Sequence, residues 1–340
     1  LSVARQPEIN TYAELFSNKE LRSAGRKKGS SILHKTDVTF THRTIHFGKA
    51  KKAGKVSAIW YFPVKSCHGI QLQEAHCTQE GIRPKDSAII DRHLCVYDPE
   101  RECFITQRQE PTMSLVKTSL NSGGKLQLDA PGQSPLVVEL PTKGRVIHCK
   151  IFKDTQACFD CGPEAERWLT NYLGGRRRCL AFAADHLPKR AESKLTTGVG
   201  PLYTAPHEKV AFAGYASYLL ATETSLEELN GRLAKPVTMD NFRPNIVVSN
   251  KTAFDEDNWQ EVYINNVRFR KVKPCERCIM TTVDHEKGKK REDEEPLKTL
   301  KTYRIKPEVS KHAPIFGADL FADLTGDISV GDDIFVIYND

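Results

Sequence analysis

Two Cys-x-x-Cys pairs, Cys158/Cys161 and Cys275/Cys278, are the residues whose type and spacing first suggest chemistry. A four-cysteine zinc site usually places its second pair roughly 15 to 20 residues after the first. Here the gap exceeds a hundred residues, so zinc binding requires that the fold bring the two pairs together. A thioredoxin-like redox pair requires a strand followed at once by a helix, a setting that neither pair has. Two ordinary thiols near a helix start are the plainer interpretation of Cys158 and Cys161.

Cys278 has a setting that favours metal binding. Arg277 precedes it, and the β-branched run 279–283 that follows predicts a strand with the thiol at its start. A neighbouring guanidinium favours the thiolate over the thiol, and the thiolate is the form that binds a metal. A buried structural cysteine fits the same spacing equally well, so the pattern alone leaves both roles open.

A second group of candidates consists of polar residues at the ends of apolar runs. Lysine, serine, arginine and asparagine side chains donate hydrogen bonds to phosphate and other anions, and arginine does so through a bidentate fork. These residues are Lys65, Ser66, Arg92, Arg243 and Asn245. A single residue of this kind usually lies on the surface at a strand end. A shared anion site therefore requires that the fold gather them.

The elements that would position these residues are mostly strands. In the first half of the chain, β-branched or aromatic runs with a period of two are separated by Gly, Pro, Asp and Asn. The predicted strands are 56–64, 94–97, 103–106, 125–128, 136–140 and 146–152. One helix follows, because Pro163 suits a first helical turn and Gly174 suits the end. Its expected apolar face consists of Trp168, Leu169, Tyr172 and Leu173.

The second half predicts another set of closely spaced strands. Residues 186–201, with two Pro and two Gly, indicate a linker or long loop. A helix is expected to begin at Ser225, which would form a capping box with Glu228. The predicted strands are 246–248, 262–264, 267–272, 278–283, 302–305 and 334–338, with a charged hairpin loop at 285–295. Strands without alternating helices favour barrels or sandwiches, so the predicted fold class is mainly β, of the α+β type.

A chain of 340 residues with 39% apolar content is long enough for two hydrophobic cores. We expect a basic leader over residues 1–54, a β-rich domain over 55–185 and a second β domain over 186–340. The first 55 residues hold twelve Lys or Arg and four Asp or Glu, so the net charge of +7 belongs to this leader. A solvated leader is favoured over a segment that binds nucleic acid or anionic lipid.

Apolar runs, cysteines and nucleotide-binding motifs bear on the compartment and on the electron donor. No run of about 18 apolar residues occurs, so membrane association would need an N-terminal segment that is missing or cleaved. The ten cysteines mostly sit singly in apolar runs such as 93–97, where a free thiol acts as a small hydrophobe, and this favours a reducing compartment. No dinucleotide fingerprint is found, so redox chemistry would need an external electron donor.

At these residues the sequence resembles the MOSC family, named for the C-terminal domain of molybdenum cofactor sulfurase, and within it the mitochondrial amidoxime-reducing components. The matching stretches run in order from about Val56 to the end of the chain. They are 63–67, 108–111, 241–246, 277–279, 281–284, 314 and 316–317. Several matches in register over about 280 residues are more specific than any single motif.

The resemblance implies a β-rich N-terminal MOSC-associated domain packed on a MOSC β-barrel with a few helices, with Mo-molybdopterin bound between them. By position, the residues that would hold this cofactor are Lys65, Ser66, Arg92, Arg243, Asn245, Arg277 and Cys278. The first three would hold the phosphate side of the pterin, and Cys278 would be the covalent molybdenum ligand and the catalytic residue. Two stretches depart from the family pattern: 214–217, and Glu276, which would place a negative charge near an anionic cofactor.

The implied reaction is the molybdenum-dependent reduction of N-hydroxylated compounds such as amidoximes and hydroxylamines, with electrons from cytochrome b5 and its NADH-dependent reductase. The implied location is mitochondrial, at the outer membrane facing the cytosol, and otherwise cytoplasmic. Two further functions stay open. One is a non-catalytic carrier of the cofactor; because the chain lacks a pyridoxal-type domain, it could not mobilise sulfur itself. The other is a zinc-stabilised module that binds nucleic acid. Asp284 and His285 are candidate proton relays, although a solvated turn is the plainer interpretation.

Overall fold

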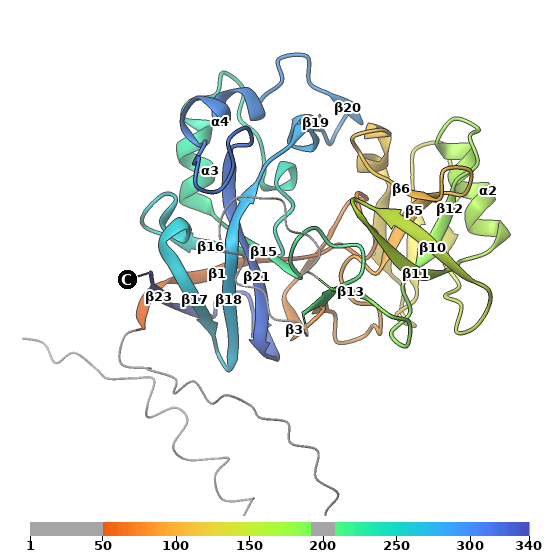
Figure 1. Cartoon of the computed structure of the whole chain (residues 1–340), viewed down its shortest axis with the longest axis horizontal. Helices are drawn as coiled ribbons and strands as arrows, with labels where there is room; N and C mark the ends of the chain where they lie inside the picture. The colour runs from red at the N-terminus through yellow and green to blue at the C-terminus, as the bar shows by residue number, and fades with distance from the viewer. Residues whose placement is uncertain (1–49, 192–207, 340) are drawn as a thin grey trace, which may run out of the picture. The chain divides into compact units, whose positions relative to one another are not determined.

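The computed structural model describes residues 50–191 and 208–339 (Figure 1). The expected basic leader at 1–54 therefore lies almost entirely outside the described residues, as does most of the expected linker at 186–201. Within the described part of the chain, no helix is both long and apolar enough to cross a membrane.

The larger sheet has eight strands in the order β16-β15-β21-β18-β17-β23-β1-β2, and an additional pairing of β16 with β1 closes it (Figure 1). Its strands are β1 (Lys51–Tyr61), β2 (Ile70–Leu72), β15 (Tyr218–Thr222), β16 (Ile246–Asn250), β17 (Trp259–Ile264), β18 (Val267–Glu276), β21 (Ile315–Leu324) and β23 (Asp333–Tyr338). The β15–β16 pair is parallel, and β21 pairs antiparallel with both β15 and β18. This sheet forms the larger barrel.

Strand β1 belongs to the large barrel although the sequence pattern groups it with the first-half strands. Val56 lies opposite Val248 of β16, and Ile59 lies opposite Ile246. All four side chains are buried. The inward alternation of β1 therefore matches that of a strand almost 200 residues away along the chain, and burial of both apolar faces determines the pairing.

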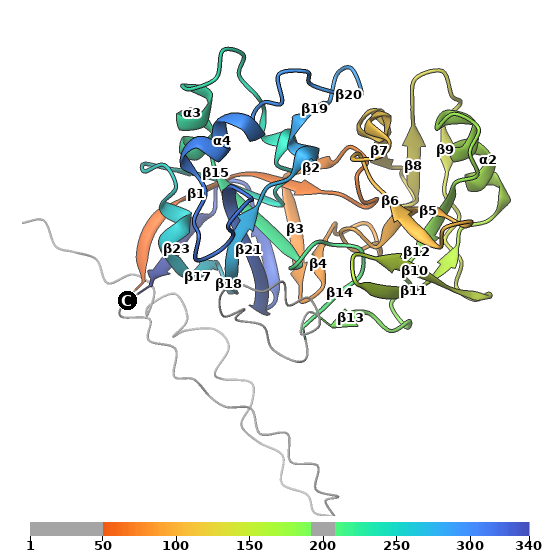
Figure 2. The ribbon, with the colours of Figure 1, turned by 45° about the horizontal axis from the view of Figure 1, so that its top comes forward.

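A second, smaller closed barrel has the order β10-β11-β12-β5-β6. Its strands are β5 (Leu94–Asp98), β6 (Cys103–Ile105), β10 (Val146–Ile151), β11 (Asp154–Asp160) and β12 (Cys179–Phe182). Helix α2 (Pro163–Tyr172) packs against β12, as the view in Figure 2 shows. The prediction of this helix is confirmed, with Trp168 and Leu169 on its buried face.

Four small sheets complete the described fold. Their strands are β3 (Glu74–Thr78), β4 (Gly81–Arg83) and β22 (Gly326–Ser329); β7 (Lys117–Leu120), β8 (Leu126–Asp129) and β9 (Leu136–Val137); β13 (Arg190–Ala191) and β14 (Lys209–Val210); and β19 (Val283–Asp284) and β20 (Lys289–Lys290). Three further 3-10 helices are η2 (Pro111–Leu115), η4 (Met239–Asn241) and η5 (Asp255–Asn258). The predicted fold class, mainly β with a few helices, is confirmed.

The start of helix α3 (Glu223–Asn230) differs from the prediction. Its N-cap is Thr222, whose side chain accepts a hydrogen bond from the backbone N–H of Ser225. The hydroxyl of Ser225 instead donates to Glu256, at 2.9 Å from Oε1. The predicted capping box of Ser225 with Glu228 is therefore wrong, because a buried carboxyl from another segment takes the serine hydroxyl.

The two predicted strands at 278–283 and 302–305 are also wrong. Residues Ile279–Thr282 form the 3-10 helix η6, in which the hydroxyl of Thr281 donates to the Cys278 carbonyl oxygen and that of Thr282 donates to Ile279. Such local hydrogen bonds compete with a strand ladder. The second stretch overlaps helix α4 (Leu297–Tyr303), whose Leu297 and Leu300 are buried. Helical spacing of these leucines prevails over the β-branched residues that follow.

The cysteines of the small barrel behave as apolar packing groups. Cys95, Cys149, Cys158 and Cys179 are buried in one cluster, and burial raises the pKa of the Cys158 thiol above its ordinary range. All ten cysteines are free. Among the described residues, one group of three metal-ligand types occurs, Asp160, Glu166 and Cys179, so the two Cys-x-x-Cys pairs do not come together to form a four-cysteine zinc site.

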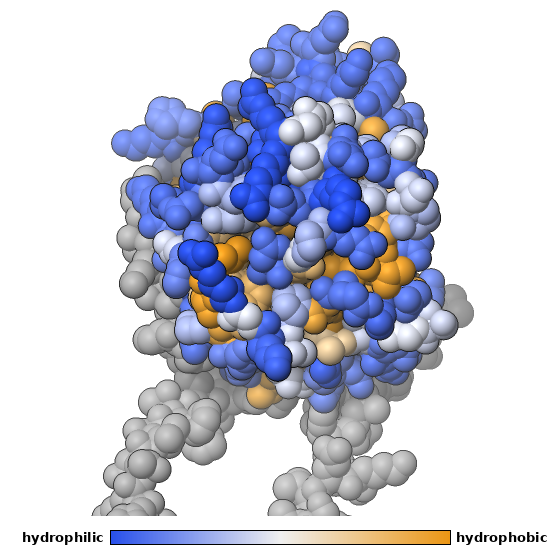
Figure 3. Space-filling model, turned by 90° about the vertical axis from the view of Figure 1, so that its right-hand side faces the viewer, coloured by the Kyte–Doolittle hydropathy of each residue, from blue (hydrophilic) through white to orange (hydrophobic). Residues whose placement is uncertain are grey.

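The face of the molecule seen in Figure 3 is largely hydrophilic, with small apolar areas separated by polar side chains. Scattered apolar exposure of this kind is ordinary for a folded protein surface.

Candidate cofactor site

A cavity of about 390 Å³ brings together every residue that the sequence suggested for the cofactor. These residues are Lys65, Ser66, Arg92, Arg243, Asn245, Arg277 and Cys278. The cavity receives side chains from both barrels, because Arg92 precedes β5 of the small barrel whereas Asn245 and Arg277 lie at strand ends of the large one. Residues that sequence reasoning did not assign also line it: Arg108, Phe152, Tyr215 and Asp319.

Three of these side chains sit on left-handed backbone. The φ angles of Ser66, Arg92 and Arg243 are 67°, 53° and 58°. Left-handed backbone costs a residue other than glycine about 1–2 kcal/mol. Such positions cluster at ligand sites, where the surrounding structure holds the residue in place. No pattern in the sequence predicts this left-handed backbone.

Lys65 is partly buried at the small-barrel side of the cavity. Its ammonium donates to the Phe212 carbonyl oxygen at 2.7 Å and lies 5.7 and 5.6 Å from the ring centroids of Phe104 and Phe152. Desolvation lowers the pKa of Lys65 well below its usual value, and the nearby Arg92 guanidinium lowers it further. The positive charge is thus held at a cost that a bound anion would offset.

Arg92 is held by the large barrel although it precedes a strand of the small one. Its guanidinium donates to Asn245 Oδ1 at 3.1 Å and to the Arg243 carbonyl oxygen at 3.0 Å. It also pairs with the carboxylate of Asp91, which accepts from the Phe62 N–H at 2.7 Å. These contacts leave Arg92 with a fixed orientation at the cavity wall.

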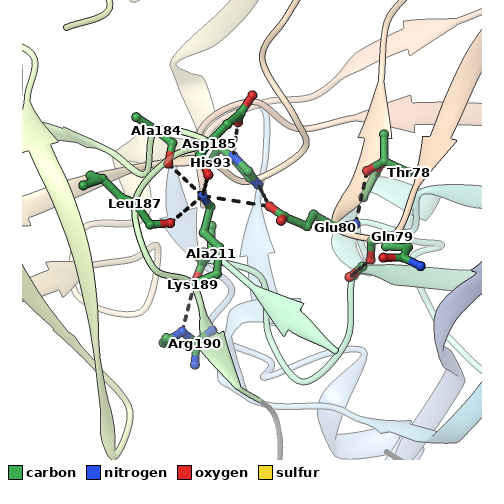
Figure 4. A network of polar contacts seen from close by, with 12 residues as sticks. Thr78, Gln79, Glu80, His93, Ala184, Asp185, Leu187, Lys189, Arg190 and Ala211 are labelled. Atoms are coloured by element: carbon green, nitrogen blue, oxygen red, sulfur yellow. Dashed lines mark hydrogen bonds and ion pairs between the residues drawn. The ribbon is translucent and has the colours of Figure 1, made fainter. Parts of the chain in front are cut away.

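Behind Arg92, a buried polar network holds the next residue, His93 (Figure 4). The His93 ring is 1% exposed, with Nε2 3.4 Å from a Glu80 carboxylate oxygen and Nδ1 3.8 Å from Asp185. The ammonium of Lys189 donates to the Ala184 carbonyl oxygen at 2.7 Å. Figure 4 shows these groups converging from separate segments, so the network ties the Arg92 loop to the chain that leaves the small barrel.

Asn245 acts through Arg92 rather than through a free amide group. The residue is fully buried, and its Nδ2 donates to the Trp60 carbonyl oxygen at 3.1 Å. Its Oδ1 accepts from the Leu219 N–H at 3.2 Å as well as from Arg92. Both ends of the amide are therefore engaged within the protein. This makes Asn245 a positioning residue at the site.

Arg243 and Arg277 each have a buried Nη2 atom without a hydrogen-bond partner. Arg277 donates from Nε to the Phe316 carbonyl oxygen at 2.9 Å and from Nη1 to the Phe242 carbonyl oxygen at 3.2 Å. The Nη2 atoms of Arg277 and Arg243 are buried without a hydrogen bond, as is Nε of Arg108. Buried cationic donors without acceptors are costly. A phosphate-bearing cofactor would supply those acceptors, so the residues present fit an anionic group.

Cys278 differs from every other cysteine of the chain. All ten cysteines lie in the described residues, and Cys278 alone among them is exposed. It opens onto the cavity as the N-cap residue of η6. Its neighbour Cys275 lies in a desolvated position, where burial raises the pKa of the thiol to about 12. Within this Cys-x-x-Cys, Cys278 is therefore the exposed thiol and Cys275 the half-buried one, although both line the cavity.

The expected relay residues lie elsewhere. Asp284 and His285 do not line the Cys278 cavity; His285 instead lines a second cavity of about 520 Å³ together with His68. Burial lowers the pKa of His285 to about 3, and the Arg243 charge lowers it in the same direction. A neutral imidazole at pH 7 is thus expected there.

Comparison with known proteins shows the family to which the chain belongs. Two family models match the chain, the MOSC N-terminal beta barrel domain over residues 53–176 and the MOSC domain over residues 207–335. Mitochondrial amidoxime reducing component 2 of Rattus norvegicus is 36% identical, covering 84% of each chain. The chain belongs to the MOSC family. Mitochondrial amidoxime-reducing component 1 of Homo sapiens is 33% identical to this MOSC protein, again covering 84% of each chain.

Among solved structures, the YUAD protein from Bacillus subtilis covers 86% of this MOSC protein and 99% of its own chain, at 11% identity and a TM-score of 0.37. A TM-score this low does not establish a shared fold. The family membership rests on the sequence matches, and it confirms the resemblance seen at residues 63–67 and 277–279.

Proposed function

We propose that this protein is a molybdenum-cofactor-dependent reductase of N-hydroxylated compounds such as amidoximes and hydroxylamines. The observation that carries the proposal is the cavity in which the one exposed cysteine, Cys278, shares a wall with buried Arg donors that lack acceptors. A soft thiolate suits molybdenum, and arginine forks suit a phosphate. The names of the relatives, amidoxime-reducing components, support the same activity.

In this proposal Lys65, Ser66 and Arg92 bind the phosphate side of the cofactor, and Arg243 and Arg277 complete its charge compensation. Asn245 keeps the Arg92 fork oriented through the 3.1 Å hydrogen bond. The Cys278 thiolate ligates the metal. When bound, the cofactor supplies the two-electron redox change, while the protein positions the substrate and excludes water.

The overall reaction breaks the N–O bond of the substrate. Two electrons and two protons enter: one proton goes to the nitrogen, and the other joins the departing hydroxyl, which leaves as water. We propose a mitochondrial location, which the names of the relatives support. We also propose cytochrome b5 and its NADH-dependent reductase as the electron source, as the family resemblance implies. We propose that this location is the outer membrane, facing the cytosol.

The test pairs two cysteines of one motif. Protein made in a host that synthesises the cofactor is analysed for molybdenum by mass spectrometry and assayed for benzamidoxime reduction with a reconstituted donor chain. Cys278→Ala should lose both the metal and turnover, because it removes the accessible ligand. Cys275→Ala is the matched control and should retain both, because its thiol lies in a desolvated position.

Absence of molybdenum from the wild-type protein would refute the proposal. Molybdenum bound without turnover would favour a non-catalytic carrier of the cofactor instead. Loss of metal in both cysteine variants would contradict the assignment of Cys278 as the single protein thiolate.

A further inference from the structure

The smaller barrel is closed by a short contact between β10 and β6. Strand β10 pairs with β11 along its whole length, Val146–Ile151. Its other edge meets β6 in a single register pair, Lys150 with Cys103. The barrel is therefore closed only near the end of β10, and the edge of its first residues pairs with no strand of the described chain.

This open edge presents backbone groups of Val146 and His148. The N–H of Lys150 donates to the Glu102 carbonyl oxygen at 2.7 Å, so the backbone groups of Lys150 point away from β11. Alternate residues of a strand direct these groups to the same side. Those of Val146 and His148 therefore point to the open edge, where no residue of the described chain hydrogen-bonds them. An unpaired edge is a template for another extended chain.

A cavity of about 710 Å³ lies along the open edge. Val146, His148 and Lys150 of β10 form one wall, and Tyr97 and Pro99 of the β5–β6 hairpin form another. We call this cavity the β10 groove. Its volume lies within the range of ligand pockets, roughly 300–1,000 Å³. The groove is therefore large enough for a short extended peptide.

Positive charge exceeds negative charge in the β10 groove. Its charged lining residues are Lys143, Arg145, Lys150, Arg177, Glu102 and Asp160. Lys150 pairs with Glu102 at 3.2 Å, and Arg177 pairs with a carboxylate of helix α2 at 2.7 Å. Lys143 and Arg145 are exposed, and neither forms an ion pair with any residue that the structure describes. These two cations are available to a negatively charged ligand.

The parts of the chain outside the described residues do not carry the complementary charge. Residues 1–55 hold twelve Lys or Arg and four Asp or Glu, and residues 192–207 hold one residue of each charge. Neither segment matches a positive groove. The groove therefore fits a segment of another protein better than it fits these two.

We propose that the β10 groove binds an extended, acidic segment of a partner protein, which adds a strand to the open edge of β10. Backbone hydrogen bonds to Val146 and His148 hold the segment in register, as in other cases of strand addition. Its carboxylates pair with Lys143 and Arg145. A nucleic acid would use the same cations but would leave the N–H and C=O groups of the strand edge without partners.

The β10 groove is separate from the cofactor cavity. Phe152, in the turn that follows β10, lines the cavity that contains Cys278, whereas Val146 at the start of β10 lines the groove. Six residues of strand separate the two ends by roughly 20 Å. A bound segment therefore leaves the cofactor cavity open, and the inference does not depend on the proposed reductase activity.

The test measures binding to the cofactor-loaded full chain by fluorescence polarisation. The probe is a fluorescein-labelled peptide of about eight residues in which glutamate alternates with valine, a usual strand length. Three comparison probes are the same peptide with lysine in place of glutamate, the same peptide with every backbone nitrogen methylated, and a single-stranded DNA of equal charge. Wild type should bind the acidic peptide at least about tenfold more tightly than each of these, because only that peptide offers both the charge and the backbone donors.

His148→Pro removes the outward N–H of the open edge and leaves the hydrogen bonds with β11 in place, since proline is tolerated at a strand edge. It should weaken the acidic peptide roughly 3- to 10-fold, the range of one hydrogen bond. His148→Ala is the matched control, because it keeps the N–H, and its affinity should stay within about twofold of wild type. Thermal melting by circular dichroism establishes that each variant is folded.

The charge is tested by a double variant. Lys143→Gln with Arg145→Gln should weaken the acidic peptide roughly 3- to 10-fold, since two exposed ion pairs are lost. The matched control is Arg83→Gln with Lys251→Gln, which removes one arginine and one lysine at exposed positions outside the groove. It should leave the affinity unchanged.

No polarisation change at millimolar acidic peptide would overturn the proposal. Equal affinity for the acidic peptide and its methylated form would overturn strand addition, and binding of DNA as tightly as the peptide would show a general surface for polyanions instead. Unchanged peptide affinity in folded His148→Pro would overturn the role of the open edge independently of the choice of probe.

Discussion

The guanidinium groups of Arg92 and Arg243 both lie over the ring of Phe62, at 4.6 and 4.3 Å from its centroid. The two residues are also linked, because the Arg92 guanidinium donates to the backbone carbonyl oxygen of Arg243 at 3.0 Å. Desolvation lowers the pKa of Arg243 to about 9, and the Arg92 charge adds to this effect. Two cations on one ring, Arg243 buried and Arg92 partly exposed, form a site that a bound anion completes.

Replacement of Arg243 should weaken cofactor binding without lowering the thermal stability of the cofactor-free protein. We expect Arg243→Met to lose most of its molybdenum after purification, because a charge-assisted hydrogen bond worth about 1.5–3 kcal/mol is removed. The melting temperature of the cofactor-free protein should stay equal or rise, since a desolvated cation disappears. Mass spectrometry and calorimetry measure the two effects.

The control for this variant is Arg232→Met. Arg232 also stacks on an aromatic ring, that of Tyr303 at 4.1 Å, but its side chain is 49% exposed. Its loss should leave the molybdenum content unchanged. A large fall in the stability of cofactor-free Arg243→Met would contradict the electrostatic account.

Asn245→Ala should destabilise the fold itself. It leaves the Trp60 carbonyl oxygen and the Leu219 N–H without their side-chain partner in a buried place. We expect a loss of about 2–4 kcal/mol in the free energy of unfolding by urea titration, since each buried unsatisfied group costs about 1–3 kcal/mol. Asn121→Ala removes two hydrogen bonds in an exposed turn and should cost less than about 1 kcal/mol. An equal loss of unfolding free energy in Asn245→Ala and Asn121→Ala would refute the buried hydrogen-bonding role of Asn245.

Glu256 should make stability fall as pH rises. Burial raises its pKa from 4.5 to about 7, although the hydroxyls of Ser225 and Thr222 donate to it. Between these values the unfolded chain ionises while the folded one retains the proton, so the free energy of unfolding decreases by about 3 kcal/mol from pH 4.5 to 7. Glu256→Gln should remove that decrease, as chemical denaturation at several pH values can show. The same pH dependence of the unfolding free energy in wild type and Glu256→Gln would be evidence against this prediction.

His285, unlike Glu256, should make stability fall as pH decreases. Because its pKa is lowered from 6.5 to about 3, the folded state resists protonation, and stability is lost as pH falls below 6.5. His285→Phe should reduce the acid sensitivity by about 3 kcal/mol at pH 4. His148→Phe, at an exposed position on β10, is the control and should leave the profile unchanged. Normal titration of His285 near pH 6.5 by NMR would contradict this prediction.

Some parts of the fold follow from local pattern. Helix α2 could be predicted because Pro163 and the apolar residues Trp168 and Leu169 lie within two helical turns of each other. The capping of α3 could not, because the group that takes the Ser225 hydroxyl is Glu256, 31 residues away. The strand predicted at 278–283 failed for a local reason, the hydroxyl bonds of Thr281 and Thr282, which β propensity does not weigh.

The sequence by itself determined the mainly β fold class, the candidate cofactor residues and, through its resemblance, the MOSC family. Only the tertiary structure decided that Lys65, Arg92 and Cys278 share one cavity, that Asn245 is engaged within the protein, and that Phe152, Tyr215 and Asp319 adjoin it. Propensity and motifs act over a few residues. Burial, desolvation and the pairing of donors with acceptors depend on groups that meet only when strands distant in sequence close the two barrels.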